Sequence, residues 1–289
     1  MQLALGTVQF GIAYGIAGRS QAVPELEVRS ILEDAVARGV RMLDTAAAYG
    51  DIEQRLGRLA EGLPLEIVSK VPAIPDELSP AAAATFVLRS ARQSRDRLGT
   101  ALRGLMLHRS ADLAAGPRGD AVWVVLSDWS RTEGVKLGAS CYSPSECASL
   151  ARDRGIALSQ LPGNALDQRI ARIAPDSPLR HVEIHLRSAF LQGLLLMPFA
   201  QAAARLPVAA QALERWHAGY AARGLAPLEA ALKVVKSFDH VSAVVVGVDS
   251  LAQWVEIAQA WECARAEAAP ELTCEQPEVI DPRLWSAAS

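Results

Sequence analysis

Several residue types that mark other classes of protein are scarce in this sequence. Only four cysteines occur among 289 residues, none in a Cys-x-x-Cys pair, and none of the five histidines has zinc-finger spacing. These absences exclude a disulfide scaffold and a zinc finger. We therefore expect free thiols, as suits a reducing cytoplasm, and no metal centre.

Long apolar runs and an excess of positive charge are also missing. No stretch of about 18 apolar residues occurs, so no transmembrane helix is predicted. The N-terminal residues Met1 to Thr7 lack the basic region and apolar core of a signal peptide. The net charge is −3, which favours neither nucleic acid nor an anionic membrane as a partner. We therefore expect a cytoplasmic protein.

Apolar residues, by contrast, make up 51% of the chain, enough for a large core. Short apolar runs that end in Gly, Ser or polar residues predict strands, and longer periodic runs between them predict helices. The predicted strands cover residues 3–6, 40–44, 66–70, 102–107, 135–140, 156–160, 182–186 and 241–246. The predicted helices cover residues 24–38, 52–60, 81–98, 120–132, 145–154, 208–223, 228–238 and 251–263.

Strands that alternate with helices predict parallel pairing through crossover helices. Eight such units favour an α/β fold of the (β/α)8 TIM-barrel type, although the pattern alone leaves an open doubly wound sheet as an alternative. No linker interrupts the chain, so we expect one domain over residues 1–289, with a poorly periodic tail from about residue 269. Gly11, Gly15 and Gly18 do not have dinucleotide-fingerprint spacing and predict a flexible first loop.

Polar residues stand at the ends of consecutive predicted strands. The second strand ends in Asp44, with Tyr49 five residues later, the third ends in Lys70, and His108 follows the fourth. Active sites of (β/α)8 barrels lie at this end of the strands, so these side chains are expected to converge. An ammonium lowers the pKa of a nearby phenol, a carboxylate holds the ammonium, and a neutral imidazole donates to a substrate oxygen. The set suits hydride transfer to a carbonyl, where negative charge develops on oxygen.

Each of these residues also has an ordinary structural explanation. Asp44 could cap the next helix, Tyr49 could be a partly buried ring, Lys70 a solvated strand end, and His108 a structural histidine. Each explanation is sufficient for one residue taken alone. Together, at consecutive strand ends and at this spacing, the four residues favour a functional site.

The sequence resembles the aldo-keto reductases in four segments, and the resemblance runs from about Leu3 to Ala258. The segments are Leu5-Gly-Thr-Val-Gln-Phe-Gly11, Leu43-Asp-Thr-Ala-Ala-Ala-Tyr-Gly50, Ile67-Val-Ser-Lys70 and Leu105-Met-Leu-His108. The resemblance implies an NAD(P)(H)-dependent oxidoreductase that acts on carbonyl or CH–OH groups. It implies Tyr49 as general acid and base, Lys70 and Asp44 as the residues that tune it, and His108 as the residue that orients the carbonyl.

The resemblance also implies a site for NADP(H) or NAD(H). Ser140 and Gln160 would bind the carboxamide, and Arg187 would stand where the family often has a ring-stacking Tyr. The remaining implied contacts are Ser188, Phe190, Leu191 and Gly193 for the pyrophosphate, and Gly247, Val248, Asp249, Gln253 and Glu256 for the adenosine end. Apart from the resemblance, Gln9 and Phe10 after the first strand are candidates to line the substrate pocket, and Phe10 would fit a core position equally well.

The sequence departs from the family pattern at two places. Cys141 follows Ser140, where the family commonly has Asn. The segment Val248-Asp249-Ser250 has no Lys or Arg, where many members bind the 2′-phosphate of NADPH. An acidic residue repels a phosphate and accepts from a free ribose hydroxyl. We therefore expect NADH to be used at least as well as NADPH.

Two other functions stay open at this point. The first is a catalytically silent nicotinamide-cofactor-binding regulator or sensor on the same barrel, because a fold does not settle function. The second is aldol or isomerase chemistry through a Schiff base on Lys70. The expected partner is a small-molecule carbonyl or alcohol, with small polar carbonyls or sugars favoured over steroids. The sequence predicts a monomer or a small homo-oligomer and specifies neither the physiological substrate nor the direction of the reaction.

Overall fold

The strands form a closed ring of eight, and the predicted (β/α)8 barrel is confirmed. A computed structural model describes residues 1–12 and 21–285. All neighbouring strands are parallel, and the ring closes between the first and last strands, from Gln2 opposite Ala243 to Gly6 opposite Gly247. The strands are β1 (Gln2–Gly6), β2 (Met42–Asp44), β3 (Glu66–Val71), β4 (Leu102–Leu107), β5 (Lys136–Ser140), β6 (Leu158–Pro162), β7 (Glu183–Arg187) and β8 (Ala243–Gly247).

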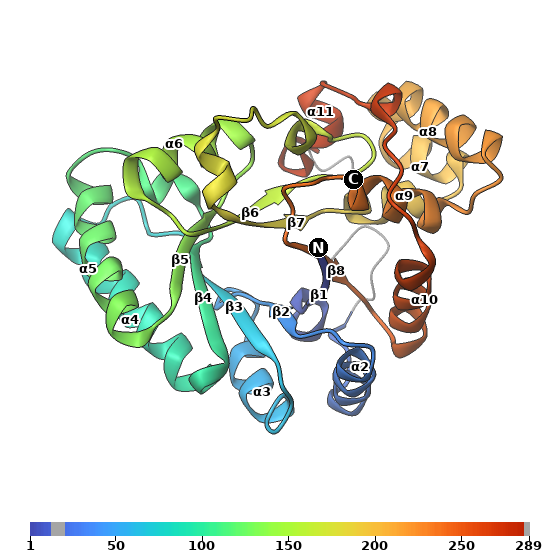
Figure 1. Cartoon of the computed structure of the whole chain (residues 1–289). Helices are drawn as coiled ribbons and strands as arrows, with labels where there is room; N and C mark the ends of the chain where they lie inside the picture. Colours follow the sequence, from blue (N-terminus) through green and yellow to red (C-terminus); the bar gives the residue numbers. More distant parts are fainter. Residues whose placement is uncertain (13–20, 286–289) are drawn as a thin grey trace.

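Helices surround this ring, with the strands at the centre of the view in Figure 1. They are α1 (Val8–Gly11), α2 (Glu25–Ala37), α3 (Ile52–Leu59), α4 (Pro80–Leu98), α5 (Pro117–Glu133), α6 (Pro144–Arg154), α7 (Phe199–Arg205), α8 (Ala210–Ala222), α9 (Pro227–Lys236), α10 (Leu251–Cys263) and α11 (Pro277–Ile280). Short 3-10 turns at Arg169–Arg172 and Pro178–His181 stand between β6 and β7, where no helix was predicted. In the described ranges, no helix is long and apolar enough to cross a membrane.

Local sequence explains where several of the helices begin and end. The Ser79 and Ser143 side chains cap α4 and α6 by accepting from Ala82 N and Glu146 N, and a proline follows each serine. Both helices end at a glycine with positive φ, Gly99 at 57° and Gly155 at 67°. These capping serines, prolines and terminal glycines can be recognised in the sequence alone. The boundaries of α4 and α6 were therefore predicted closely.

The largest core cluster lies between the strands and the helices and includes, for example, Val28, Ile31, Leu32 and Ala35 on the buried face of α2. A second, small cluster consists of Val68, Met106 and Leu158. These three residues come from β3, β4 and β6, so side chains of non-adjacent strands meet there. We conclude that this cluster lies inside the barrel.

The C-terminal tail, which the sequence left without a predicted place, packs back onto the barrel. Cys274 N donates to Leu166 O at 2.8 Å, and Gln168 Nε2 donates to Ala269 O at 2.7 Å. The tail contains α11 and two short 3-10 turns, and Figure 1 shows it in red, passing from α10 towards β6 and β7. It therefore borders the loops that follow β6. The loop predicted around Gly15 and Gly18 lies outside the described residues.

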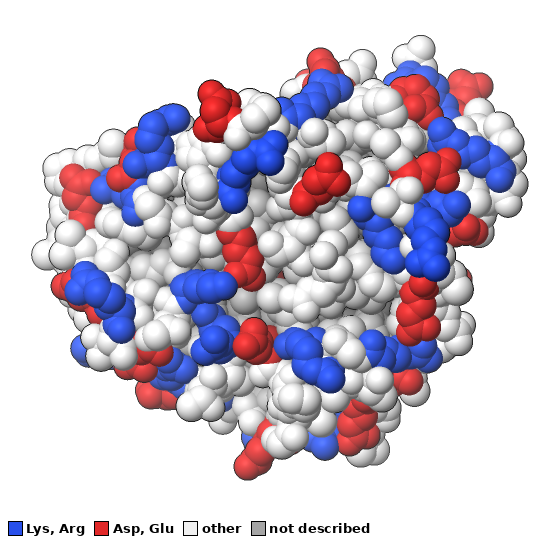
Figure 2. Space-filling model, viewed as in Figure 1, with Lys and Arg blue, Asp and Glu red and all other residues white. Residues whose placement is uncertain are grey.

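Charged side chains of both signs are interspersed over the face shown in Figure 2, around a hollowed centre that is mostly uncharged. The four cysteines are free thiols, with Cys263 exposed and the other three buried.

Candidate active site

Strand geometry brings the predicted polar residues together. Successive side chains of a strand point to opposite sides, so residues two apart share a side. Lys70, His108 and Gln160 each stand two residues after a member of the interior cluster Val68, Met106 and Leu158. They therefore point into the barrel, one layer above this cluster and at the C-terminal ends of the strands.

A buried ion pair between Lys70 and Asp44 forms the centre of the site. Lys70 Nζ lies 2.7 Å from both carboxylate oxygens of Asp44, and it also donates to Thr45 O at 3.1 Å. Gln160 Nε2 donates to Asp44 Oδ1 at 2.8 Å. Only 1% of the Lys70 side chain and 8% of the Asp44 side chain are exposed. Burial lowers the pKa of Lys70, and the Asp44 carboxylate opposes that shift by stabilising the charged ammonium.

Tyr49 and His108 lie beside this ion pair. Their rings meet edge to face, with centroids 6.0 Å apart and planes at 85°, and Lys70 Nζ lies 5.8 Å from the centroid of the Tyr49 ring. The pKa of His108 is lowered from 6.5 to about 4, mainly by burial and further by the positive charge of Lys70. The imidazole is therefore neutral at physiological pH and can donate a hydrogen bond without carrying charge.

The structure thus brings together the four residues predicted from the strand ends. Asp44 is not a helix cap, because the residue before α3 is Asp51. Lys70 is not a solvated strand end, because its ammonium is enclosed by Asp44 and Thr45. For Asp44 and Lys70, the purely structural explanations considered from the sequence therefore do not hold.

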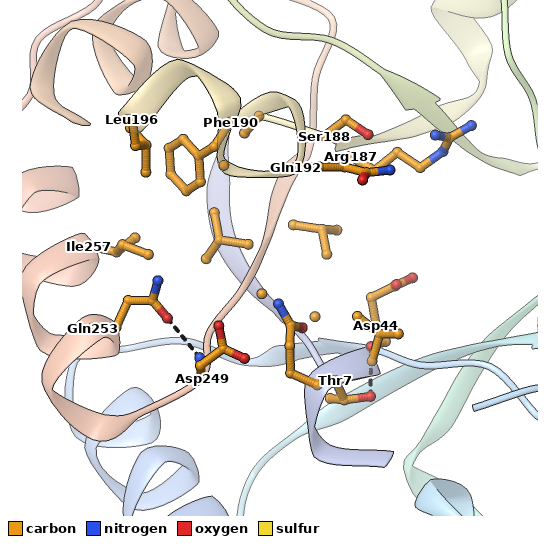
Figure 3. A pocket seen from close by; sticks show the side chains of 18 of the residues that line it. Thr7, Asp44, Arg187, Ser188, Phe190, Gln192, Leu196, Asp249, Gln253 and Ile257 are labelled. Atoms are coloured by element: carbon orange, nitrogen blue, oxygen red, sulfur yellow. Dashed lines mark hydrogen bonds between the residues drawn. The ribbon is translucent and has the colours of Figure 1, made fainter. Parts of the chain in front are cut away.

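A cleft of about 230 Å³ opens beside Asp44 and Tyr49. Figure 3 shows its two ends: Thr7, Asp44 and Arg187 lie at one, and Asp249, Gln253 and Ile257 lie at the other. The loop after β7 forms one wall, and the residues that follow β1 and β8 form another. A long, narrow ligand lying between these walls would have one end at the Asp44–Lys70 pair.

The wall after β7 has a strained backbone. Ser188, Leu191 and Gln192 have φ of 62°, 49° and 55°, and they are the non-glycine residues with positive φ in the described ranges. Gly193 follows with φ of 91°. Within the described residues, the amides of Ser188 and Phe190 donate no backbone hydrogen bond. Strain of this kind concentrates at functional sites, and consecutive amides in such turns make anion-binding concavities.

The wall after β8 depends on a glycine. A Cβ on Gly247 would lie 2.4 Å from Gln9 Oε1, so a larger residue would displace the Gln9 side chain from the cleft. Gln9 Oε1 is buried and accepts no hydrogen bond from the described residues. A buried amide oxygen without a donor is destabilising, which indicates that a ligand or water completes it.

The far end of the cleft lies at the start of α10. Leu251 N donates to Glu27 Oε1 at 3.1 Å, Gln253 N donates to the Ser250 hydroxyl at 3.2 Å, and Asp249 N donates to Gln253 Oε1 at 2.7 Å. Helix N-termini commonly bind phosphate through such amides. Here these donors already have acceptors from the chain itself.

The predicted ligand contacts divide into two groups. Those that line the cleft are Gln9, Gln160, Arg187, Ser188, Phe190, Gly193, Gly247, Asp249 and Gln253. Those outside the lining are Phe10, Ser140, Leu191, Val248 and Glu256. Of these, Phe10, Leu191 and Val248 are fully buried, Ser140 is 3% exposed, and Glu256 lies on the exposed side of α10.

Several lining residues were not predicted, namely Thr7, Gln192, Leu196, Val245 and Ile257. Thr7 could have been found, because it follows the first strand and the strand-end rule applies to it. Its hydroxyl donates to Asp44 O at 3.0 Å and so connects β1 to the site. The apolar pair Leu196 and Ile257 carries no such signal in the sequence, since its orientation depends on how the loop and α10 pack.

Fold and site together define a (β/α)8 barrel with a polar cleft at the C-terminal ends of its strands. Residues 2–111 match the model of the aldo/keto reductase family. This stretch contains Asp44, Tyr49, Lys70 and His108, and the predicted resemblance to the aldo-keto reductases is confirmed.

Solved structures show the same fold over nearly the whole chain. The holo form of the aldo-keto reductase AKR11C1 from Bacillus halodurans matches with a TM-score of 0.71 and 19% identity, covering 96% of this chain and 95% of that one. The aldo-keto reductase PA4992 from Pseudomonas aeruginosa, described as putative, gives 0.62 and 22%, covering 90% and 88%. A second structure, of a putative aldo-keto reductase from the same organism, gives 0.61 and 23%, covering 89% of each chain. No curated protein matches the sequence.

Proposed function

We propose that this protein is a nicotinamide-dependent oxidoreductase that reduces an aldehyde or ketone, with sugars among the candidates, or oxidises the matching alcohol. The observation that carries the proposal is the buried Asp44–Lys70 pair next to Tyr49 and His108, at one end of the cleft. A barrel that needed these residues only for stability would gain little from a buried ion pair there, because its desolvation offsets much of the attraction.

The cleft fits an extended dinucleotide on three observations. The amides of the strained Ser188 to Phe190 turn suit a pyrophosphate, and the orphaned Gln9 Oε1 suits a hydrogen-bond donor on the ligand. Gln160 donates to Asp44 through Nε2, which leaves its Oε1 to accept from a carboxamide. When bound, the cofactor would supply or accept the hydride.

The residues of the site have separate roles in this proposal. Tyr49 delivers a proton to the carbonyl oxygen in reduction and removes it in oxidation. The Lys70 ammonium lowers the pKa of this phenol, and Asp44 keeps the ammonium charged and in place. His108, neutral because its pKa is about 4, donates to the same oxygen and stabilises the charge that develops on it.

The proposed cofactor preference is NADH at least as strongly as NADPH. In the described residues, the amides of Asp249, Leu251 and Gln253 all have acceptors within the chain, so these three are not available to a 2′-phosphate. The described lining residues at this end include the Asp249 carboxylate and no Lys or Arg. A carboxylate accepts from ribose hydroxyls and repels phosphate.

The experiment that tests the proposal combines binding and turnover. The protein is titrated with NADH and NADPH by fluorescence, and a panel of carbonyl compounds is then followed by NADH absorbance. Tyr49→Phe should keep dinucleotide binding and lose about 100-fold or more of kcat, because it removes the transferable proton. Tyr220→Phe, on α8, removes a hydroxyl outside the cleft and serves as the control.

Each outcome has a clear meaning. No binding of either dinucleotide would overturn the proposal, whereas binding far tighter for NADPH would overturn only the cofactor preference. Near-normal turnover in Tyr49→Phe would refute the proton-transfer role. Binding without turnover of any carbonyl or alcohol would favour the silent regulator or sensor.

A further inference from the structure

Arg187 is the cationic side chain that lines the cleft among the described residues, and it lies at the catalytic end. It ends β7 and lines the same surface as Asp44, Tyr49 and Gln160. In Figure 3 its side chain extends along the wall on the Asp44 side, away from Asp249 and Gln253.

The guanidinium of Arg187 has no carboxylate partner in the part of the chain that is described. No ion pair within 4.0 Å includes it, although most other arginines of the fold form one. Its Nη2 donates to Cys141 O at 3.2 Å, while its Nε is buried and donates to nothing described. A partly buried cation with an unsatisfied N–H is unfavourable unless a further partner completes it.

No described neighbour forms an ion pair with Arg187, although Asp281 lies near enough for the Arg187 charge to contribute to lowering the pKa of that carboxyl. Its Cζ lies 4.4 Å from the centroid of the Tyr142 ring, a contact that holds the guanidinium without removing its charge. Arg283 contacts the same ring at 3.3 Å, but Arg283 is paired with Asp281 at 2.5 Å. Of the two arginines that share Tyr142, the one in the cleft is therefore the one without a counter-ion.

The charge of Arg187 acts on the reacting groups. It contributes to lowering the pKa of both Lys70 and His108, after burial in each case. An anion bound to Arg187 would thus lie close to the Lys70–Tyr49–His108 group, where the carbonyl of a substrate is expected. A planar anion can accept two parallel hydrogen bonds from a guanidinium, which fixes its orientation as well as its position.

We propose that Arg187 binds an anionic group of the substrate, a carboxylate or a phosphate, so that the enzyme selects acidic aldehydes, ketones or sugars over neutral ones. This inference rests on the oxidoreductase function proposed above. The phosphates of the dinucleotide are the other source of such an anion, and the test separates the two sources.

The test measures binding to the complex with the oxidised dinucleotide, in which no hydride is available to reduce the ligand. Two matched pairs are compared by calorimetry: 4-oxobutanoate with butanal, and glyceraldehyde 3-phosphate with glyceraldehyde. The acidic member of at least one pair should bind roughly 10- to 100-fold more tightly than the neutral member. The preference should fall to about 3-fold or less in Arg187→Gln, because the amide has no charge. It should take an intermediate value in Arg187→Lys, because lysine keeps the charge but lacks the paired N–H donors of the guanidinium.

Arg283→Gln is the matched control, since it removes the other guanidinium that contacts Tyr142 and should leave the preference intact. Equal affinity for both members of both pairs, or a preference that persists in Arg187→Gln, would overturn the inference and leave the oxidoreductase function standing. A loss of dinucleotide affinity of about 10-fold in Arg187→Gln, with the preference unchanged, would assign the guanidinium to the cofactor instead. No dinucleotide binding by the wild-type protein would remove both proposals.

Discussion

Lys70 Nζ lies 2.7 Å from both carboxylate oxygens of Asp44, in a position where neither group has substantial contact with water. This pair can be dissected by a double-mutant cycle. Asp44→Asn leaves a buried ammonium without its counter-ion, and Lys70→Met leaves a buried carboxylate. We expect each single variant to lower the free energy of unfolding by about 3–5 kcal/mol. Chemical denaturation measures both values.

The double variant Asp44→Asn/Lys70→Met distinguishes the structural role of the pair from its functional role. It removes both charges, so its stability should recover to within about 2 kcal/mol of the wild type. Its activity should stay about 100-fold or more below the wild type, because no ammonium then lies beside the Tyr49 ring to stabilise its phenolate. Recovery of turnover together with stability would show that the pair acts only on folding.

The lowered pKa of His108 predicts a specific dependence of stability on pH. The folded pKa is about 4, below the unfolded value of 6.5, so the unfolded chain binds this proton first as the pH falls. The stabilising contribution is therefore complete above pH 6.5 and is lost as the pH falls towards 4. It amounts to at most about 3 kcal/mol, and less because the ring is partly exposed.

This dependence is measured as the difference in unfolding free energy between the wild type and His108→Gln from pH 7.5 down to 4.5. The difference should shrink steadily below pH 6.5. His181→Gln, on the exposed surface, is the control and should give a flat difference. A His108 difference that does not change with pH would mean that the imidazole is not kept neutral by its surroundings.

The side chains of the candidate site were predictable because two simple regularities act on them. Parallel strands in a barrel end at one rim, and side chains two apart on a strand share a side. Asp44, Lys70 and His108 could be found from their positions alone, and so could Gln160 and Arg187. Thr7 obeys the same regularity at the first strand.

The remaining features depend on contacts between segments far apart in sequence. The tail around Cys274 has no periodic pattern of its own, and its backbone bonds to Leu166 more than a hundred residues earlier. The seven-residue helix α7 (Phe199–Arg205) is too short to give a clear period. The orphaned Nε of Arg187 is also invisible in the sequence, because it depends on where the loop after β5 places Tyr142 and where the tail places Asp281.

We expect the proposed cofactor preference to respond to substitutions at the end of the cleft near α10. Asp249→Lys replaces a lining carboxylate with an ammonium, and we expect the affinity for NADPH to rise about 10-fold or more relative to NADH. Glu256→Lys makes the same change of charge seven residues later, on the exposed side of α10. It should change the ratio of affinities by about 3-fold or less.

Fluorescence titration of both variants with NADH and NADPH measures this ratio of affinities. Equal effects of the two substitutions would indicate a general electrostatic response rather than a contact at the cleft. If the ratio of NADPH to NADH affinity were unchanged in both variants, the 2′-position of the ribose would not bind near Asp249.

Glu183, at the start of β7 and so at the opposite end of the barrel, provides a test of stability that is separate from catalysis. Its carboxylate bonds His185 Nε2 at 2.9 Å and also contacts the Lys136 ammonium. The hydrogen bond with His185, followed by that with Lys136, lowers the pKa of Glu183 from 4.5 to about 2. The folded pKa lies below the unfolded one, so the stabilisation is complete above pH 4.5 and is lost as the pH falls towards 2.

Glu183→Gln should therefore lower the free energy of unfolding by about 2 kcal/mol at pH 7 and by progressively less below pH 4.5. The amide oxygen can still accept a hydrogen bond from His185, so the effect reports the loss of the negative charge that contacts both His185 and Lys136. Glu66→Gln, at the start of β3, is the control, because its pairing with Arg103 at 3.4 Å is more than half exposed on both sides and contributes little. Urea denaturation between pH 7 and 3 gives the comparison. Equal destabilisation by the two variants at pH 7 would show that the Glu183 network contributes no more than a surface ion pair.

Carbonyl reduction should be unchanged in Glu183→Gln, because the carboxylate lies at the end of the barrel away from Tyr49.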